Sequence, residues 1–290
     1  MWRWLRPSRR ERFTLGPGCS PTWWYTWQVA GWRSRSGKIV VDHRGSIAIL
    51  KFNRADKLNA LSVPMLEDVA AALKWLGGGD DASAIVVTGA GRAFSAGDDL
   101  PATESLSRVA FERLLRGFQE LTRSVLSSHV PVVAALNGIA VGGAAEFTLA
   151  CDARVGYPGA AFLFPENDVG LTISNASTYL LPRLVGSRAL PLILDARRIE
   201  GTEAHQLGLI DHLVETKEEV VPKALAVAGR WVERGLATAF HLRMLRPPMD
   251  EVEAAIAREN EIGAEAWEAG TAETGITRFL KEQMARKKQT

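Results

Sequence analysis

The sequence has few cysteines and histidines for its 290 residues. Its two cysteines, Cys19 and Cys151, cannot build the disulfide framework of a small secreted protein, and such scarcity is typical of a reducing compartment. The five histidines do not show the short spacings of zinc ligands; they are His43, His129, His205, His212 and His241. We therefore predict a cytoplasmic location and no structural metal.

A long uninterrupted hydrophobic run is also missing. The most apolar segment begins at Val130 and reads "VPVVAALNGIAVGGAAEFTLAC". Asn137, a glycine pair and Glu146 interrupt it, so the segment favours a buried strand followed by a buried helix over a membrane span. We predict no membrane span.

A strong charge of one sign is absent from most of the chain. The formal net charge is +2, but residues 1–37 hold seven arginines against one acid, and the remaining residues hold 28 basic and 32 acidic side chains. A body with this slightly acidic balance does not resemble a nucleic-acid-binding surface. No nucleic-acid partner is expected for it.

Residues 1–37 form a segment of their own, with six of the nine tryptophans. Arginine and serine with little acid are typical of transit peptides, but the clustered tryptophans, prolines and glycines argue against an amphipathic helix. Three interpretations stay open: a disordered or artefactual extension, a segment that contacts membrane or nucleic acid, or an organelle-targeting segment that would place the protein in the mitochondrial matrix.

From Lys38 onward the chain alternates strand and helix patterns. "KIVVDHRGSIAILKF" predicts a β-hairpin, and the valine-rich runs "AIVVT" and "PVVAAL" predict strands buried on both faces. Helices are predicted between and after these runs, at about residues 104–128, 143–151, 176–185 and 201–208. After about Lys217 no strand pattern returns. The sequence therefore predicts an α/β core over residues 38–216 and a helical region over residues 217–290.

Two glycine-containing turns predict a site for a negatively charged oxygen. The chain passes from a strand through Gly142 into a helix that begins at Gly143, where backbone N–H groups lack intrahelical partners. If the turn at Ser95, Ala96 and Gly97 lies beside it, two amides can converge on one carbonyl oxygen and stabilise its charge during a reaction.

Two acids stand in otherwise apolar segments near these turns. Glu146 lies one helical turn after Gly143, and Glu166 follows Pro165 in "FLFPENDVGL". Burying a carboxylate without a partner is costly, so both acids indicate chemistry, although a structural glutamate bound to backbone amides is the alternative for Glu146. The pattern predicts general acid and base work on a thioester or a similar carbonyl compound.

Six segments in order resemble the enoyl-CoA hydratase/isomerase, or crotonase, superfamily: "NRADKLNALS", "GAGRAFSAGDDL", "PVVAALNGIAVGGAAEFTLACD", "FLFPENDVGL", "LPRLVG" and "TEAHQLGLIDHLV". The resemblance covers about residues 38–283. It implies a crotonase-like α/β spiral of ββα repeats, with C-terminal helices that assemble a homotrimer or homohexamer. It also implies an acyl-CoA thioester substrate, which carries its own coenzyme A, and no further cofactor.

The resemblance assigns roles to individual residues. The amides of Ala96 and Gly143 correspond to the family's oxyanion hole, with Gly142 beside them. Glu146 corresponds to the residue that activates water for attack at C3, and Glu166 to the one that delivers a proton to C2.

The segment "DKLNAL" corresponds to the family's CoA-binding strand end. It places Lys57 and Leu58 near the pantetheine or adenine part of CoA, with a solvated surface lysine as the alternative for Lys57.

Three positions depart from the common pattern or need their own interpretation. Asp98 stands where straight-chain hydratases have a small or apolar residue; it either lines the acyl pocket and favours a polar or cyclic acyl group, or faces solvent. Asp99 is expected to order its loop and cap the following helix. "TISNASTYLLPRLVG" replaces a glycine-rich turn and adds Asn175 to the pocket wall.

The resemblance favours a lyase of fatty acid metabolism that hydrates the C2=C3 bond of a 2-enoyl-CoA. The alternatives are another crotonase-type reaction, such as double-bond isomerisation, cyclic dienoyl-CoA hydration or acyl-CoA hydrolysis, and a non-enzymatic scaffold that binds RNA or membrane through residues 1–37.

Overall fold

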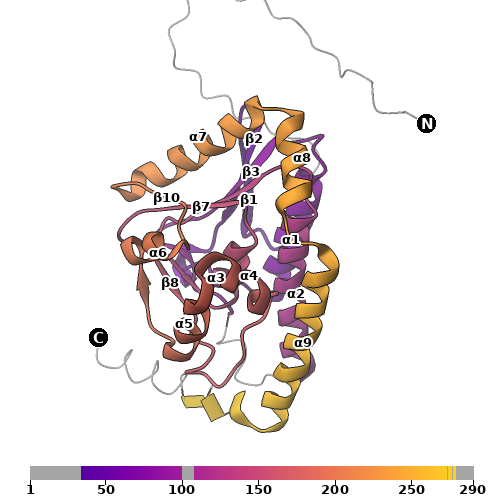
Figure 1. The fold of residues 1–290 in the computed structure, drawn as a ribbon, viewed down its shortest axis with the longest axis vertical. Coiled ribbons are helices and arrows are strands. Elements are labelled where there is room, and N and C mark those ends of the chain that lie inside the picture. Colours follow the sequence, from indigo (N-terminus) through magenta and orange to yellow (C-terminus); the bar gives the residue numbers. More distant parts are fainter. Residues whose placement is uncertain (1–33, 100–107, 273, 276, 279–290) are drawn as a thin grey trace, which may run out of the picture.

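The computed structural model describes residues 34–99, 108–272, 274–275 and 277–278. These residues form two β-sheets with helices packed around them (Figure 1). The expected segment 1–37 therefore lies outside the described residues apart from its last four. The predicted helix start at residue 104 also falls outside them, and the structure describes that helix from Arg108.

The larger sheet has the strand order β1-β2-β3-β5-β7-β10. The predicted hairpin is present, because β1 (Ile39–Arg44) and β2 (Ile47–Phe52) pair antiparallel. From β2 onward all pairs are parallel. The remaining strands are β3 (Ala84–Gly89), β5 (Val132–Ala135), β7 (Ala153–Gly156) and β10 (His212–Leu213). Strands β3 and β5 are buried throughout, as expected for valine-rich strands covered on both faces.

A second sheet, of order β4-β6-β8-β9, is built from very short strands. They are β4 (Ala93–Ser95), β6 (Ile139–Val141), β8 (Ala161–Leu163) and β9 (Ile199–Glu200). Three times the chain leaves a strand of the larger sheet, enters the second sheet and continues to a helix: β3-β4-α2, β5-β6-α3 and β7-β8-α4. This succession is the predicted ββα repeat, and it brings the ends of β4, β6 and β8 together.

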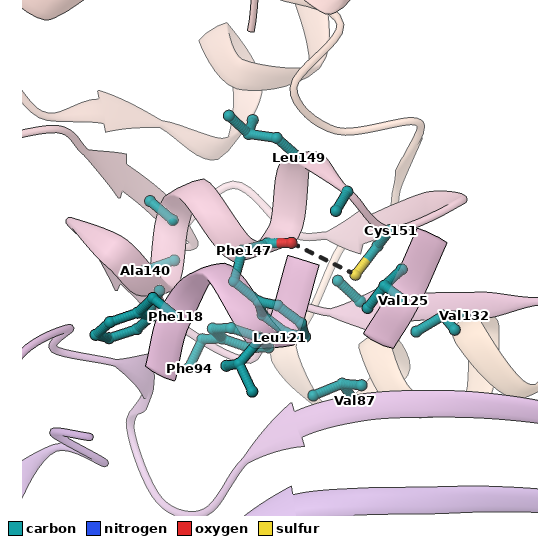
Figure 2. Packing of buried hydrophobic residues seen from close by; sticks show 14 of the residues in the cluster. Val87, Phe94, Phe118, Leu121, Val125, Val132, Ala140, Phe147, Leu149 and Cys151 are labelled. Atoms are coloured by element: carbon teal, nitrogen blue, oxygen red, sulfur yellow. Dashed lines mark hydrogen bonds between the residues drawn. The ribbon is translucent and has the colours of Figure 1, made fainter. Parts of the chain in front are cut away.

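The helices of the core follow in chain order. They are α1 (Val63–Gly77), α2 (Arg108–Leu126), α3 (Gly143–Leu149), α4 (Ser177–Val185), α5 (Ala189–Asp195) and α6 (Gly201–Leu207), with 3₁₀ turns at Ala55–Lys57, Gly186–Arg188 and Lys217–Glu219. α3 is enclosed by other elements. In Figure 2 Phe147 of α3 lies close to Phe118, Leu121 and Val125 of α2, and its carbonyl faces the Cys151 thiol.

Three helices follow the core: α7 (Val220–Glu233), α8 (Leu236–Leu245) and α9 (Met249–Glu268). α7 covers one face of the larger sheet through Val220, Ala224 and Val227, and a second apolar cluster forms there. α9 runs beside α2 (Figure 1). No helix among the described residues has the length and apolar character that a membrane crossing needs.

Candidate active site

Two buried asparagines hold the chain between β3 and Asp98 in shape. The Asn59 side-chain amide donates to the carbonyls of Ala90 and Ala93 at 2.8 and 2.9 Å. The Asn137 amide donates to Gly91 and Ala93 at 3.1 Å each, and its Oδ1 accepts the Gly89 N–H. Because these side-chain amides bind the carbonyls of the loop, the loop backbone is held in place and its remaining N–H groups point in fixed directions.

Most amides of this loop already have partners. The Ala96 N–H donates to the Leu58 carbonyl at 2.9 Å, the Gly97 N–H to Ser95 Oγ at 3.1 Å, and the Asp99 N–H to the Leu61 carbonyl at 3.3 Å. Within the part of the chain that the structure describes, the Asp98 N–H has no partner. This corrects the expectation for Ala96: its donor is occupied, and the unoccupied donor of the loop lies two residues later.

The second turn leads directly into α3. Gly142 has φ 53° and ψ −131°, a conformation that glycine adopts without strain, and the first intrahelical bond runs from the Glu146 N–H to its carbonyl. The N–H of Gly143, the first residue of the helix, therefore has no intrahelical partner. A side chain at Gly143 would meet the Phe118 ring, and one at Gly142 would lie 3.2 Å from Glu166 Oε1.

The two turns touch each other and enclose a cavity. A Cβ on Gly97 would clash with the Val141 carbonyl, so the loop lies directly against the turn before α3. Beside them is a cavity of about 70 Å³, lined by the following residues: Ala96, Asp98, Phe111, Leu115, Phe118, Val141, Gly142, Gly143, Glu146, Pro165, Glu166, Val169, Leu171, Thr172 and Ser174. Sequence segments far apart, including both expected glutamates, thus meet in one place.

Glu146 is buried and held by three hydrogen bonds. Its Oε1 accepts the Ser174 N–H at 2.9 Å, and its Oε2 accepts Ser174 Oγ at 2.8 Å and Asn175 Nδ2 at 2.7 Å. Burial, and then the neighbouring Glu166 carboxyl, raise the pKa of Glu146 well above its ordinary value, although the Ser174 donors oppose the shift. Asn175 thus positions Glu146 and does not line the cavity, which corrects its expected place in the pocket wall.

Glu166 and Asp98 are held differently. Glu166 Oε2 and Asp98 Oδ1 are both enclosed, and neither has a hydrogen-bond partner within the described residues. Burial raises the pKa of Glu166 to about 8, with Asp98 adding to the rise, and burial raises the pKa of Asp98 to about 7. Asp98 therefore belongs to the cavity, and the interpretation as a solvent-facing aspartate is wrong for its Oδ1.

The remaining expected residues are not among those that line the cavity. Lys57 is exposed at the end of a 3₁₀ turn, and Leu58 has φ 50° and contacts the loop through its carbonyl. Asp99 Oδ2 accepts Arg54 Nη1 at 2.5 Å, and the start of the helix that Asp99 was expected to cap lies outside the described residues. No group of three or more potential metal ligands gathers anywhere in the described ranges.

α9 supports the wall that holds Glu146. The buried Glu259 carboxylate accepts the N–H groups of Ala176 and Thr178, both at 2.8 Å, and Thr178 Oγ1 at 2.7 Å. Asn175 and Ala176 have φ values of 63° and 62°, a backbone conformation that residues other than glycine adopt at a cost in free energy. Glu259 stabilises this strained turn and with it the donors to Glu146.

Comparison with known proteins identifies the family. The enoyl-CoA hydratase/isomerase family model matches residues 42–288. The chain belongs to the enoyl-CoA hydratase/isomerase family. It is 29% identical over 251 residues to a crotonyl-CoA hydratase of Syntrophomonas wolfei, covering 85% of this chain and 96% of the relative. It is 35% identical over 214 residues to a probable enoyl-CoA hydratase of Mycobacterium bovis, covering 70% and 74%.

Solved structures agree with the fold. An enoyl-CoA hydratase/isomerase from Mycobacterium paratuberculosis superimposes with a TM-score of 0.76 at 27% identity, covering 83% of this chain and 98% of that one. The crotonase-like fold expected from the sequence is thereby confirmed. The sequence did not identify Ser174 or the free Asp98 N–H as parts of the site. A serine two residues before a predicted helix and an amide beside a glycine carry no distinctive sequence signal.

Proposed function

We propose that the protein is a lyase that hydrates the C2=C3 double bond of a 2-enoyl-CoA thioester. The observation that carries this proposal is the meeting of two buried glutamates, Glu146 and Glu166, in one cavity beside the free amides of two turns. Its relatives include proteins named enoyl-CoA hydratase and crotonyl-CoA hydratase. The geometry supports acid and base groups on one side of a bound thioester and N–H donors on the other.

The N–H groups of Gly143 and Asp98 are the proposed oxyanion hole. Both residues line the cavity, and both amides lack a partner in the described chain. When water adds to C3, electrons of the double bond move toward the thioester oxygen and form an enolate. Two N–H donors at that oxygen stabilise the developing charge more than they stabilise the neutral carbonyl.

The two glutamates divide the proton transfers. Three donors at Glu146 favour its ionised form, while Glu166 Oε2 has none, so the proton that the buried pair retains resides on Glu166. Glu146 takes a proton from water as its oxygen bonds to C3, and Glu166 gives its proton to C2 as the enolate collapses. The product is a 3-hydroxyacyl-CoA, and a proton passing from Glu146 to Glu166 restores the starting state.

Double-bond isomerisation is the second candidate. The three hydrogen bonds to Glu146 favour it, because they leave Glu166 as the glutamate with a free oxygen. A single acid that moves one proton between two carbons suffices for that reaction.

The surroundings of the site support further parts of the proposal. CoA enters past Leu58 and Lys57, whose segment borders the Ala96 loop, and the reaction uses water and carboxyl groups without an added cofactor. A homotrimer or homohexamer is proposed because α8 exposes apolar side chains. A cytoplasmic location is proposed from the bacterial relatives and the low cysteine content.

Glutamine substitutions test the assignment of the glutamates. Glu146→Gln and Glu166→Gln each keep the side-chain shape but remove the base or the acid, so the rate of hydration of a 2-enoyl-CoA should fall by about 10²-fold or more in each. The rate is followed by the loss of the conjugated thioester absorbance. If Glu146→Gln keeps the parental rate and Glu166→Gln is inactive, isomerisation replaces hydration as the function.

A further inference from the structure

Asp98 brings a third carboxyl group into the cavity. Its Oδ1 is enclosed without a hydrogen-bond partner among the described residues, although the residue as a whole is only half-buried. Glu166 Oε2 is in the same state, and no hydrogen bond joins the two side chains. A buried acceptor without a donor lowers the stability of the fold, so an unused acceptor that faces a cavity is suited to a donor on the bound molecule.

No side chain among the described lining residues donates a hydrogen bond to Asp98 Oδ1. Apart from the three acids, the described lining is mostly apolar, and it includes no lysine, arginine or histidine; its large apolar members are Phe111, Leu115, Phe118, Val141, Val169 and Leu171. The one described lining serine, Ser174, donates its hydroxyl group to Glu146 Oε2. An alkyl chain packed against Asp98 would leave its carboxyl group unsatisfied.

We infer that Asp98 is a specificity-determining residue that accepts a hydrogen bond from a hydroxyl group on the acyl chain, so that the preferred substrate is a hydroxylated 2-enoyl-CoA. This inference rests on the proposed function and narrows its substrate class. The carboxyl oxygen accepts the O–H, and the rest of the acyl chain contacts the apolar walls. A site built to bind a hydroxyl group discriminates strongly against the analogue that lacks it.

The place of the hydroxyl group follows from the neighbours of Asp98. Its own N–H is proposed to hold the thioester oxygen on C1, and its carboxyl group is close enough to Glu166, which serves C2, to affect its charge. Because the Asp98 N–H and Glu166 are assigned to C1 and C2, the proposal places the donor that the Asp98 carboxyl group binds farther along the acyl chain, beyond the double bond. A hydroxyl group on C4 or C5 is in reach.

Two isosteric substrate pairs test the inference with the full chain. 4-Hydroxybut-2-enoyl-CoA is compared with pent-2-enoyl-CoA, and 5-hydroxypent-2-enoyl-CoA with hex-2-enoyl-CoA; in each pair a hydroxyl group replaces a methyl group. The parent should prefer the hydroxylated member of at least one pair by about tenfold or more in kcat/KM. Asp98→Ala, which keeps the backbone N–H, should reduce that preference by about tenfold or more. Asp98→Asn, whose amide oxygen still accepts, should retain part of it.

Asp168→Asn is the matched control, because Asp168 is an exposed carboxyl group two residues from Glu166 and should leave the preference unchanged. Equal preference in the parent and in Asp98→Ala would overturn the inference while hydration itself stood. If the parent hydrates neither pair, the proposed function fails instead. In that case the inference is tested by the dissociation constants of a saturated pair, 4-hydroxybutanoyl-CoA and pentanoyl-CoA. If the parent binds the hydroxylated member more tightly and Asp98→Ala loses this preference, the inference is supported. If the preference is the same in both proteins, it is refuted.

Discussion

At the scale of single residues, the cavity gathers three acids, and two of them, Glu166 and Asp98, keep an enclosed oxygen without a hydrogen-bond partner. Glu146 and Glu166 are both buried, and Asp98 stands beside Glu166. A structure selected only for stability would pair such groups with cations or exclude them. Sites that carry perturbed carboxyl groups at a cost in stability are typical of catalysis.

The cost should appear as a pH-dependent stability that involves Glu166. Its pKa is raised from 4.5 to about 8 by burial, so the folded protein keeps a proton that the unfolded chain releases above about pH 4.5. Stability therefore falls as the pH rises from about 4.5 to about 8. The glutamine in Glu166→Gln does not titrate. The melting temperature of this variant should therefore rise relative to that of the parent as the pH increases from about 5 to about 8. Thermal unfolding of both proteins across this range measures the difference, and a constant difference would contradict the raised pKa.

Residue roles were only partly predictable from the sequence. Glu146 and Glu166 could be singled out because a charged residue in an apolar segment is unusual in any fold. The choice between the amides of Ala96 and Asp98 could not be made, since it depends on which N–H the Leu58 carbonyl occupies. The same holds for Asp99, whose partner Arg54 lies 45 residues earlier in the chain.

At the scale of elements, α8 is a helix with an unusually apolar exposed side. Leu236, Phe240, Met244 and Leu245 are all exposed by more than half. A second cavity, of about 530 Å³, lies between α8 and the ends of α3 and α4, where Leu242 and Leu245 line it. Exposed apolar side chains gathered on one helix are typical of an interface between subunits.

We expect α8 to contribute to the contact between subunits of a homotrimer or homohexamer. Replacing Phe240 and Met244 together by glutamate places charges in that contact and should shift the protein to smaller species. Size-exclusion chromatography with light scattering measures the mass. Arg258→Glu on the exposed part of α9 is the control and should leave assembly intact. A parent protein that is monomeric at micromolar concentration would contradict the expected assembly.

Elements with a strong pattern were predictable and very short ones were not. The hairpin β1-β2 and strands β3 and β5 follow from alternation and from valine-rich runs. Strands β4, β6 and β8 have three residues each, too few to show a period, and they form only because their neighbours pair with them. Since the second sheet brings the two turns together, the cavity itself could be expected only through the family resemblance.

At the scale of the whole molecule, each level of the structure serves the same cavity. The ββα succession brings the turn after β4 against the turn after β6, the segment after β8 supplies Glu166 and Ser174, and α9 braces the strained turn through Glu259. Every described residue of the cavity lies between Ala96 and Ser174. The central claim is that this one cavity adds water to an unsaturated thioester.

The most direct measurement is a hydration assay of the purified full-length protein. It is incubated with a panel of straight-chain, hydroxylated, branched, aromatic and alicyclic 2-enoyl-CoAs, while the absorbance of the conjugated thioester is followed and the products are identified by mass. We predict that the absorbance falls for at least one substrate and that its product is the 3-hydroxyacyl-CoA, one water heavier. Unchanged absorbance and mass across the whole panel would contradict the account.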